Sequence, residues 1–355
     1  MILFLITIAN LVSAQAEPNE LQKKWYPGHY LYVSPRSFAE PMEQSNRNLV
    51  KDNPYFTGYH VKYYWAALEK EKGVYDFSLI EQDLVTARAD GKKICIFIHD
   101  RDHTGTTVPV PLYLGEDPIY EGGYYKDFAT TTDTYKYMPK IWVPAVAERM
   151  GELLKAIGAR FDEDTCIAYV NTPETSLTGS KKQPGFSATR LKDGYKIIYS
   201  AAAEAFPKTI FSQYTNWPGG LERAGSDEMM LHLATLRHGM GSPDALEPLR
   251  PYIGTETASS GALENWFGPY YTQYRGIIPI TTGAQAPSYK ANNPLTVLNY
   301  AINHLNVHFF TWNPQKKSGS PDNVFGIDEV IEMLNAEKGR INTTPPASVL
   351  KKKLI

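Results

Sequence analysis

The sequence has little cysteine: two residues, Cys95 and Cys166, in a chain of 355. Two cysteines cannot build a disulfide-rich scaffold. Each lies in a short apolar run typical of a buried strand, so both could stay free, or one disulfide could join neighbouring strands. Cysteine and histidine do not cluster at metal-ligand spacing, and His99 with His103 is the closest histidine pair. We therefore expect no metal and no cofactor.

The sequence also lacks an excess of charge of one sign. Its 36 basic and 38 acidic residues give a formal net charge of -2 and are mixed along the chain. This excludes the basic surface that nucleic acid or an anionic membrane requires. After residue 16 no segment approaches the ~20 apolar residues of a membrane span. We expect a neutral small-molecule partner, no nucleic acid and no membrane, and the oligomeric state stays open.

Residues 1–16, MILFLITIANLVSAQA, form the one apolar run of signal-peptide length, and they end on the pattern Ala14-Gln15-Ala16. An apolar stretch that closes on A-x-A is typical of a secretory signal. The run carries no Lys or Arg, so a buried first strand or helix is the alternative. We expect an exported protein, secreted or periplasmic, whose mature chain begins after residue 16.

Along the rest of the chain, short apolar runs alternate with longer amphipathic segments, which indicates repeated strand-helix units. The pattern predicts a single (β/α)8 barrel over residues 17–340, followed by a C-terminal extension, 341–355. The long connection 100–138 has little periodicity, and a loop of this length is usually functional. The expected strands are 29–34, 58–65, 93–99, 166–171, 209–215, 252–256, 276–282 and 307–312, with RHGMGSPD (237–244) as a ninth candidate. The expected helices are 77–90, 143–161, 188–206, 226–237, 262–274, 295–305 and 327–336.

Carboxylates, amides and aromatic rings follow these strands. In a barrel, the carboxyl ends of the strands converge on one mouth. Aromatic faces cover the apolar side of a sugar ring, polar groups bind its hydroxyls, and a pair of carboxylates can cleave a glycosidic bond. The chain has no P-loop, no G-x-G-x-x-G after a strand and no G-x-S-x-G. The chemistry of the mouth therefore favours a sugar over a phosphate or an ester.

Three segments resemble glycoside hydrolases built on (β/α)8 barrels. YYWAALEKEKGVYDFSLIEQDL (63–84) is similar to their second-strand signature, and the segments 153–176 and HFFTW (308–312) resemble the fourth and last strands of the retaining superfamily called clan A. The resemblance implies that Glu174 is the general acid/base and that Trp312 lies under the sugar. The residues that carry the first match are Trp65, Glu69, Gly73, Tyr75, Asp76 and Phe77.

The sequence departs from clan A at two places. An Asn directly precedes the acid/base Glu in that superfamily, whereas Thr172 and Pro173 separate Asn171 from Glu174. The superfamily carries its nucleophile at the end of strand seven, where GIIPITTGAQAP has no acid. Glu256 becomes the nucleophile on strand seven if 237–244 is strand six, and on strand six otherwise. Asp244 and Glu264 are the reserve candidates for the second carboxylate.

We predict an exported, retaining glycoside hydrolase with Glu174 as general acid/base and Glu256 as nucleophile. Two alternatives stay open: a barrel that binds glycans without cleaving them, and a polysaccharide lyase or metal-dependent hydrolase that uses His99, Asp100 and His103. The sequence leaves the sugar, the linkage and endo or exo action open. The residues expected to bind substrate are Trp65, His99, Asp100, Asp102, Asn171, Tyr214, Asn216, Trp217, Gln285 and Trp312.

Overall fold

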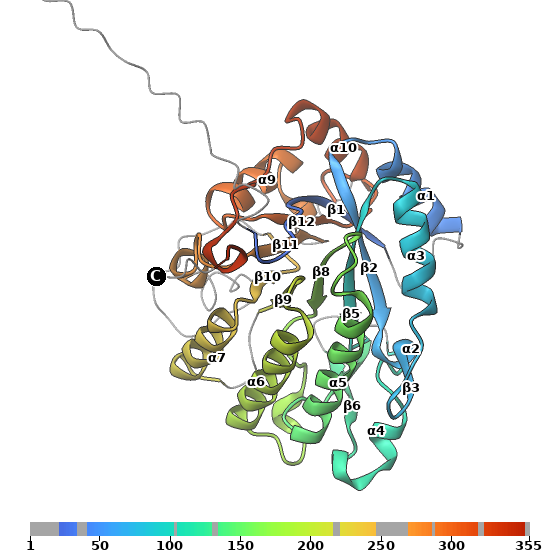
Figure 1. The fold of residues 1–355 in the computed structure, drawn as a ribbon, viewed down its shortest axis with the longest axis vertical. Helices are drawn as coiled ribbons and strands as arrows, with labels where there is room; N and C mark the ends of the chain where they lie inside the picture. The colour runs from blue at the N-terminus through green and yellow to red at the C-terminus, as the bar shows by residue number, and fades with distance from the viewer. Residues whose placement is uncertain are drawn as a thin grey trace, which may run out of the picture.

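Eight parallel strands close into a barrel in the computed structural model (Figure 1). Going round the barrel, the order is β1-β2-β5-β8-β9-β10-β11-β12, and β12 pairs with β1. The predicted (β/α)8 fold is confirmed. The structure describes residues 21–33, 41–102, 105–129, 134–215, 221–245, 269–285, 288–318 and 323–351. The barrel strands are β1 (Gly28–Val33), β2 (Phe56–Tyr64), β5 (Lys93–His99), β8 (Ile167–Thr172), β9 (Ile210–Tyr214), β10 (Gly239–Ser242), β11 (Ile280–Ala284) and β12 (Phe309–Trp312).

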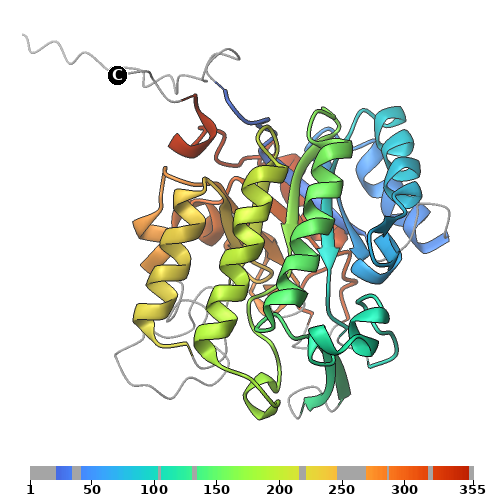
Figure 2. The same cartoon turned by 60° about the horizontal axis from the view of Figure 1, so that its bottom comes forward.

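Helices cover the outside of the barrel, and in Figure 2 α5, α6 and α7 lie side by side across one flank. α5 falls within the expected helix 143–161 and buries an apolar stripe that includes Val146, Met150 and Leu153, and it approaches α6 through small residues. A Cβ on Gly158 would lie 2.2 Å from the carbonyl oxygen of Ala205, so glycine permits this close packing. The helices are α1 (Pro41–Lys51), α2 (Trp65–Leu68), α3 (Ser78–Ala89), α4 (Tyr113–Glu116), α5 (Pro144–Phe161), α6 (Ala188–Ala205), α7 (Arg223–Thr235), α9 (Pro294–Asn303) and α10 (Ile327–Ala336).

The connection after β5 is more regular than its sequence indicates. It contains α4, a short 3-10 helix (Pro118–Tyr120) and an antiparallel hairpin of β6 (Tyr124–Ala129) and β7 (Thr134–Pro139). A second small hairpin, β3 (Glu69–Glu71) with β4 (Val74–Tyr75), follows α2. Tyr and Thr favour strands as well as loops, and this dual preference explains why the sequence pattern missed β6 and β7.

The sixth strand is β10, so the prediction of 252–256 for this position is wrong. β10 pairs in parallel with β9 on one side and with β11 on the other. A Cβ on Gly241 would lie 1.4 Å from the carbonyl oxygen of Thr281, so these two strands can approach only where glycine stands. Residues 252–256 themselves lie outside the described part of the chain.

Both faces of the barrel strands are buried, and alternate side chains point inward and outward. The outward side chains pack against the helices. A separate inner cluster fills the barrel below the mouth, and it includes Tyr30, Cys95, Tyr169, Ile210 and Phe309. The two cysteines are buried free thiols.

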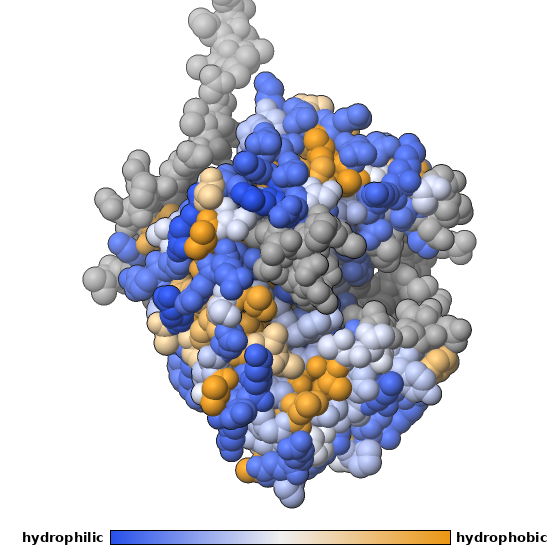
Figure 3. Space-filling view, turned by 90° about the vertical axis from the view of Figure 1, so that its right-hand side faces the viewer, coloured by the Kyte–Doolittle hydropathy of each residue, from blue (hydrophilic) through white to orange (hydrophobic). Residues whose placement is uncertain are grey.

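The first and last described residues of the chain come together against the barrel. Leu21 and Leu350 form an isolated antiparallel bridge, and Val349 is fully buried in the inner cluster. The segment 341–351, part of the predicted C-terminal extension, packs on the barrel through Val349. No helix in the described ranges is long and apolar enough to cross a membrane. The face in Figure 3 is largely hydrophilic, with small and separate apolar patches.

Candidate active site

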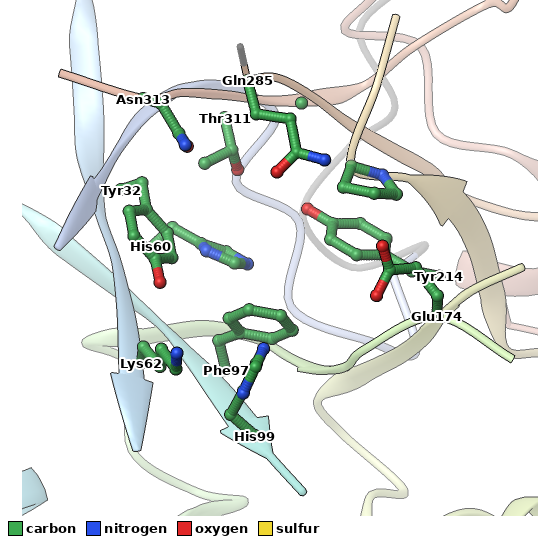
Figure 4. A pocket seen from close by; sticks show the side chains of 12 residues that line it. Tyr32, His60, Lys62, Phe97, His99, Glu174, Tyr214, Gln285, Thr311 and Asn313 are labelled. Atoms are coloured by element: carbon green, nitrogen blue, oxygen red, sulfur yellow. The ribbon is translucent and has the colours of Figure 1, made fainter. Parts of the chain in front are cut away.

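A cavity of about 150 Å³ lies at the carboxyl ends of the barrel strands (Figure 4). Its lining combines one carboxylate, one ammonium group, two amides and several rings, all of which come from barrel strands or from the residues just after them. This is the face on which barrel enzymes carry their active sites. The lining residues are Tyr32, His60, Lys62, Phe97, His99, Glu174, Tyr214, Pro243, Gly283, Gln285, Thr311 and Asn313.

Aromatic rings form the floor of the cavity. The imidazole of His60 lies 4.6 Å from the ring of Phe97 and stacks on the ring of Tyr214 at 6.3 Å, centroid to centroid. Burial lowers the pKa of His60 to about 3, so this imidazole is neutral at physiological pH. Its Nδ1 atom has no hydrogen-bond partner within the described residues. The floor is therefore aromatic and neutral, and it contains one buried nitrogen without a partner in the described chain.

Glu174 stands in a turn that is held on the side of β8. The strand runs to Thr172, whose hydroxyl donates to Oε1 of Gln213 at 2.8 Å. The amide Nε2 of Gln213 in turn donates to the carbonyl of Pro173. The inserted Thr-Pro dipeptide thus fits against β9, and Glu174 follows directly after it.

The turn is also held on its other side. The backbone N–H of Thr175 donates to the carbonyl of Tyr214 at 3.0 Å, and the hydroxyl of Tyr195 donates to the carbonyl of Thr175 at 3.2 Å. The guanidinium of Arg101 donates to the carbonyl of Ser176 at 2.7 Å. Bonds on both sides of Glu174 therefore fix the direction of its side chain, and Figure 4 shows the carboxylate facing the cavity.

Asp100 and Asp102 organise the loop after β5, and the cavity lining does not include them. Asp100 accepts a hydrogen bond from Nε of the buried Arg101 at 2.8 Å. Asp102 accepts backbone N–H bonds from Thr106 at 2.9 Å and from Thr107 at 3.3 Å. Contact of these aspartates with substrate stays a prediction, and Oδ1 of Asp100 and Oδ2 of Asp102 already bind protein groups.

Asn171 is buried beneath the cavity. Its Nδ2 atom lies 3.5 Å from Nε2 of His60, and its Oδ1 atom has no partner among the described residues. The residue does not line the cavity. Asn171 was predicted to bind substrate, and this role stays a prediction, with the inserted Thr172 and Pro173 between it and Glu174.

Gln285 and Asp244 form a bonded pair at the ends of β11 and β10. Nε2 of Gln285 donates to Oδ2 of Asp244 at 3.0 Å, and the side-chain oxygen of Gln285 points into the cavity in Figure 4. Oδ1 of Asp244 is buried with no partner in the described structure. Burial raises the pKa of Asp244 to about 7; the bond from Gln285 opposes this shift, and the charge of Glu174 adds to it.

Trp65 and Trp312, which were predicted to stack on sugar rings, do not line the cavity. Both indoles are 0% exposed. The indole N–H of Trp65 donates to Glu69 at 2.8 Å, and that of Trp312 to His29 at 3.2 Å. Because side chains alternate along a strand, Thr311 faces the cavity and Trp312 faces the helices.

The segment 63–84, which resembles the glycoside hydrolase signature, builds scaffold. Glu69 is 0% exposed and accepts hydrogen bonds from the N–H of Gly73 at 2.9 Å and from the hydroxyl of Tyr113 at 3.0 Å. The guanidinium of Arg149 forms an ion pair with it. Together with the bond from Trp65, these partners use the carboxylate fully, so Glu69 fastens the β3–β4 hairpin to α5.

The described residues contain no cluster of side chains that could hold the metal of the alternative function. No three His, Cys, Asp or Glu residues that could bind an ion lie together in the described ranges. Nδ1 of His99 lies 2.6 Å from the carbonyl of Arg101, and Asp100 is paired with the guanidinium of the same residue. Several predicted residues lie outside the described part of the chain: His103, Asn216, Trp217, Glu256, Glu264 and the signal segment 1–16.

Of the predicted binding residues, the structure brings His99, Tyr214 and Gln285 together with Glu174 around the cavity. Strand ends alone do not point to Lys62 on β2 and Phe97 on β5, which also line the cavity. Each lies two residues before the end of its strand in the structure, and alternate residues of a strand share a face.

The comparisons with known proteins show that this chain is similar in fold to solved structures. No known sequence family matches the chain, and no curated protein matches it. The catalytic domain of beta-amylase from Paenibacillus polymyxa superposes with a TM-score of 0.61 at 9% identity, covering 89% of this chain and 100% of that one. Endo-glycoceramidase II from Rhodococcus sp. superposes with a TM-score of 0.53 at 14% identity, covering 89% and 80%. A structure described as a glycoside hydrolase gives 0.52 at 10% identity, covering 89% and 100%.

Proposed function

We propose that this protein is an exported glycoside hydrolase that cleaves an oligosaccharide or polysaccharide in the mouth of the barrel. The observation that carries the proposal is the carboxylate of Glu174, fixed in a cavity of aromatic rings and amides at the end of β8. Fold neighbours named beta-amylase and endo-glycoceramidase support it. Export rests on residues 1–16, and the amino-terminal sequence of the protein recovered outside the cell tests it.

Glu174 is the proposed general acid/base. It protonates the glycosidic oxygen as the bond breaks and later accepts a proton from the attacking water. Such a role requires a carboxyl group that is held in place, because a fixed geometry makes proton transfer effectively intramolecular. The hydrogen bonds that Gln213 and Arg101 make to the turn supply this support. We propose that the reaction proceeds with retention, and the anomer of the first product, observed by proton NMR, tests this.

The sugar ring is proposed to lie between aromatic and polar walls. Phe97 and Tyr214 offer ring faces to its apolar side. Gln285, Asn313 and His99 offer polar groups to its hydroxyls. No cofactor takes part in these steps.

Two residues are candidates for the second carboxylate, and they predict different chemistry. Glu256 as the nucleophile is our proposal from the sequence. Asp244 is the second candidate because it has a buried oxygen without a partner in the described structure and bonds to the cavity residue Gln285. With a pKa of about 7, Asp244 would hold a proton near neutrality and act as the acid, leaving Glu174 as base or nucleophile. Replacement by Asn at 244 or by Gln at 256 separates the two mechanisms.

A glycan-binding barrel without catalysis is the rival function. One observation favours it: the residue after strand seven that faces the cavity is an amide, Gln285, where clan A has its nucleophile. A barrel of this kind would bind sugar and release no product.

Release of reducing ends from a polysaccharide panel tests the proposal. The wild type should release product, and Glu174→Gln should lose nearly all of this activity on substrates with poor leaving groups while keeping part of it on activated aryl glycosides. Glu116→Gln, on the exposed end of α4, is the matched control and should behave as the wild type. Binding without product by the wild type would favour the rival, and full activity of Glu174→Gln would remove Glu174 from the mechanism.

A further inference from the structure

Two lysines near the site, Lys62 and Lys136, make no hydrogen bond or ion pair with any described residue. Lys62 lines the cavity from β2, on the wall across from Glu174 in Figure 4. Its Nζ atom lies 4.6 Å from the ring centroid of Tyr64, a contact that leaves its N–H groups available. Lys136 is half-buried on β7, in the hairpin beside the mouth. These two residues are called the mouth lysines below.

Burial makes the positive charge of the mouth lysines unfavourable. Burial lowers the pKa of Lys62 to about 8, although the charges of Asp102 and Glu174 act to raise it. Burial also lowers the pKa of Lys136 against the charge of Glu174. Taking an ammonium group out of water is unfavourable unless an anion or hydrogen-bond acceptors compensate. An anion that enters the cavity would offset this cost.

The neighbouring carboxylates offset this cost only in part, since the pKa of Lys62 stays lowered despite the charges of Asp102 and Glu174. Asp100 is paired with Arg101, and Asp102 accepts backbone N–H bonds from its own loop. Asp244 is held by Gln285 and has a pKa of about 7, so it is only partly ionised at neutrality. Glu174 is the remaining carboxylate in the cavity lining, and in the proposed reaction it must carry a proton when the bond breaks. At that moment the mouth lysines face no ionised lining carboxylate.

The substrate can resolve this conflict. A cation close to a general acid favours loss of the proton that the acid must donate. An anionic group on the sugar would neutralise Lys62 and remove this effect, so substrate binding and proton retention would support each other. A neutral sugar would leave the ammonium charge opposing the acid.

We propose that the cavity binds a sugar that carries an anionic group, a uronate carboxylate or a sulfate ester, and that Lys62 contacts this group with Lys136 at the rim. The inference deepens the proposed hydrolase by naming its substrate class, and it replaces the expectation of a neutral partner. Binding itself does not require hydrolysis, so the two proposals can be tested apart.

Native affinity electrophoresis of the full protein tests the proposal. The probes are polygalacturonate, alginate, glucuronoxylan and chondroitin sulfate, each matched with its carboxyl-reduced form and, for the last, its desulfated form. Retardation by at least one acidic probe should be stronger than by its neutral match, and Lys62→Met should weaken this binding by about tenfold or more, because a hydrogen bond to a charged group is lost. The carboxyl-reduced and desulfated arms distinguish a uronate from a sulfate.

Lys181→Met is the matched control, because Lys181 is exposed and its loss changes the net charge equally. It should bind as the wild type does, and Lys62→Arg should retain part of the binding. Equal retardation by acidic and neutral matches, no retardation by any probe, or unchanged binding by Lys62→Met overturns the proposal. Binding of acidic probes without product release would support the anionic-sugar proposal and contradict the proposed hydrolase activity. Hydrolysis of neutral probes alone would support the hydrolase and contradict the anionic-sugar proposal.

Discussion

Two glutamates of this protein, Glu69 and Glu174, show how a scaffold carboxylate differs from a site carboxylate. Glu69 is 0% exposed, accepts three hydrogen bonds at 2.8 to 3.0 Å and is paired with Arg149. Glu174 faces a cavity, and its carboxylate has no hydrogen bond within the described residues. Buried polar groups are normally paired. Unpaired buried polar atoms also occur elsewhere in the described chain, at Tyr199 and His238 for example, so it is the cavity that distinguishes the surroundings of Glu174.

The surroundings of the two residues differ in the same way. Near Glu174, the atoms His60 Nδ1, Asn171 Oδ1 and Asp244 Oδ1 are buried with no partner in the described ranges. Around Glu69, each neighbour directs its polar atom at the carboxylate. Glu69 belongs to the scaffold segment 63–84, whereas Glu174 follows the Thr172-Pro173 dipeptide beside the cavity.

The largest expected effect is on catalysis at Glu174. Replacing it by Gln removes the proton donor and should lower kcat on poor leaving groups by roughly 10²–10⁴-fold. The melting temperature should not fall, because the carboxylate supports no described hydrogen bond. Steady-state kinetics and thermal unfolding of the same preparation check both parts. A variant that is fully active, or one that unfolds at a much lower temperature than the wild type, would contradict the difference between Glu174 and Glu69.

The next effect is on stability at Glu69. Arg149→Met leaves the buried carboxylate without its cation and should lower the free energy of unfolding by about 3–5 kcal/mol. Arg160→Met, on the same helix, breaks an exposed pair with Glu81 and should cost at most about 1 kcal/mol. Urea unfolding measures both variants. Turnover per folded molecule should stay at the wild-type value in each, and a selective loss of turnover in Arg149→Met would assign this network to the site.

The pH dependence of stability should show the raised pKa of Asp244. Its pKa is raised to about 7 in the folded protein, so between pH ~4 and ~7 the folded state keeps a proton that the unfolded state has lost. Stability of the wild type should therefore fall as pH rises through this window, by up to ~1.4 kcal/mol per pH unit relative to Asp244→Asn. Urea unfolding at pH 5, 6 and 8 gives the difference. Parallel curves for the two proteins would mean that Asp244 is ionised throughout.

The smallest expected effect is on stability at Trp65, and it tests whether this residue packs in the scaffold or binds sugar. Trp65→Phe keeps an aromatic ring and removes the indole N–H that binds Glu69, which should cost about 1.5–3 kcal/mol of stability. KM should not change, because the indole is buried away from the cavity. A rise in KM without loss of stability would restore the stacking role that the sequence predicted.

Part of the site could be predicted because strand ends are visible in a sequence. Glu174, His99, Tyr214 and Gln285 each follow or end an apolar run, and the barrel brings such positions together. The orientation of Trp312 could not be predicted. Both faces of a barrel strand are buried, so the run HFFTW shows no polar alternation to tell the inner face from the outer one.

The sequence by itself determined the fold class, since the rhythm of apolar runs and amphipathic segments admits few architectures besides the barrel. It also determined that Glu174 would stand at the mouth. Only the tertiary structure decided that the glycine-rich stretch Gly239–Ser242 is the sixth strand, because the close approach of Gly241 to Thr281 depends on strands that are distant in the chain. The tertiary structure also decided which carboxylates were already paired, because a side chain's partners come from elements brought together only by folding.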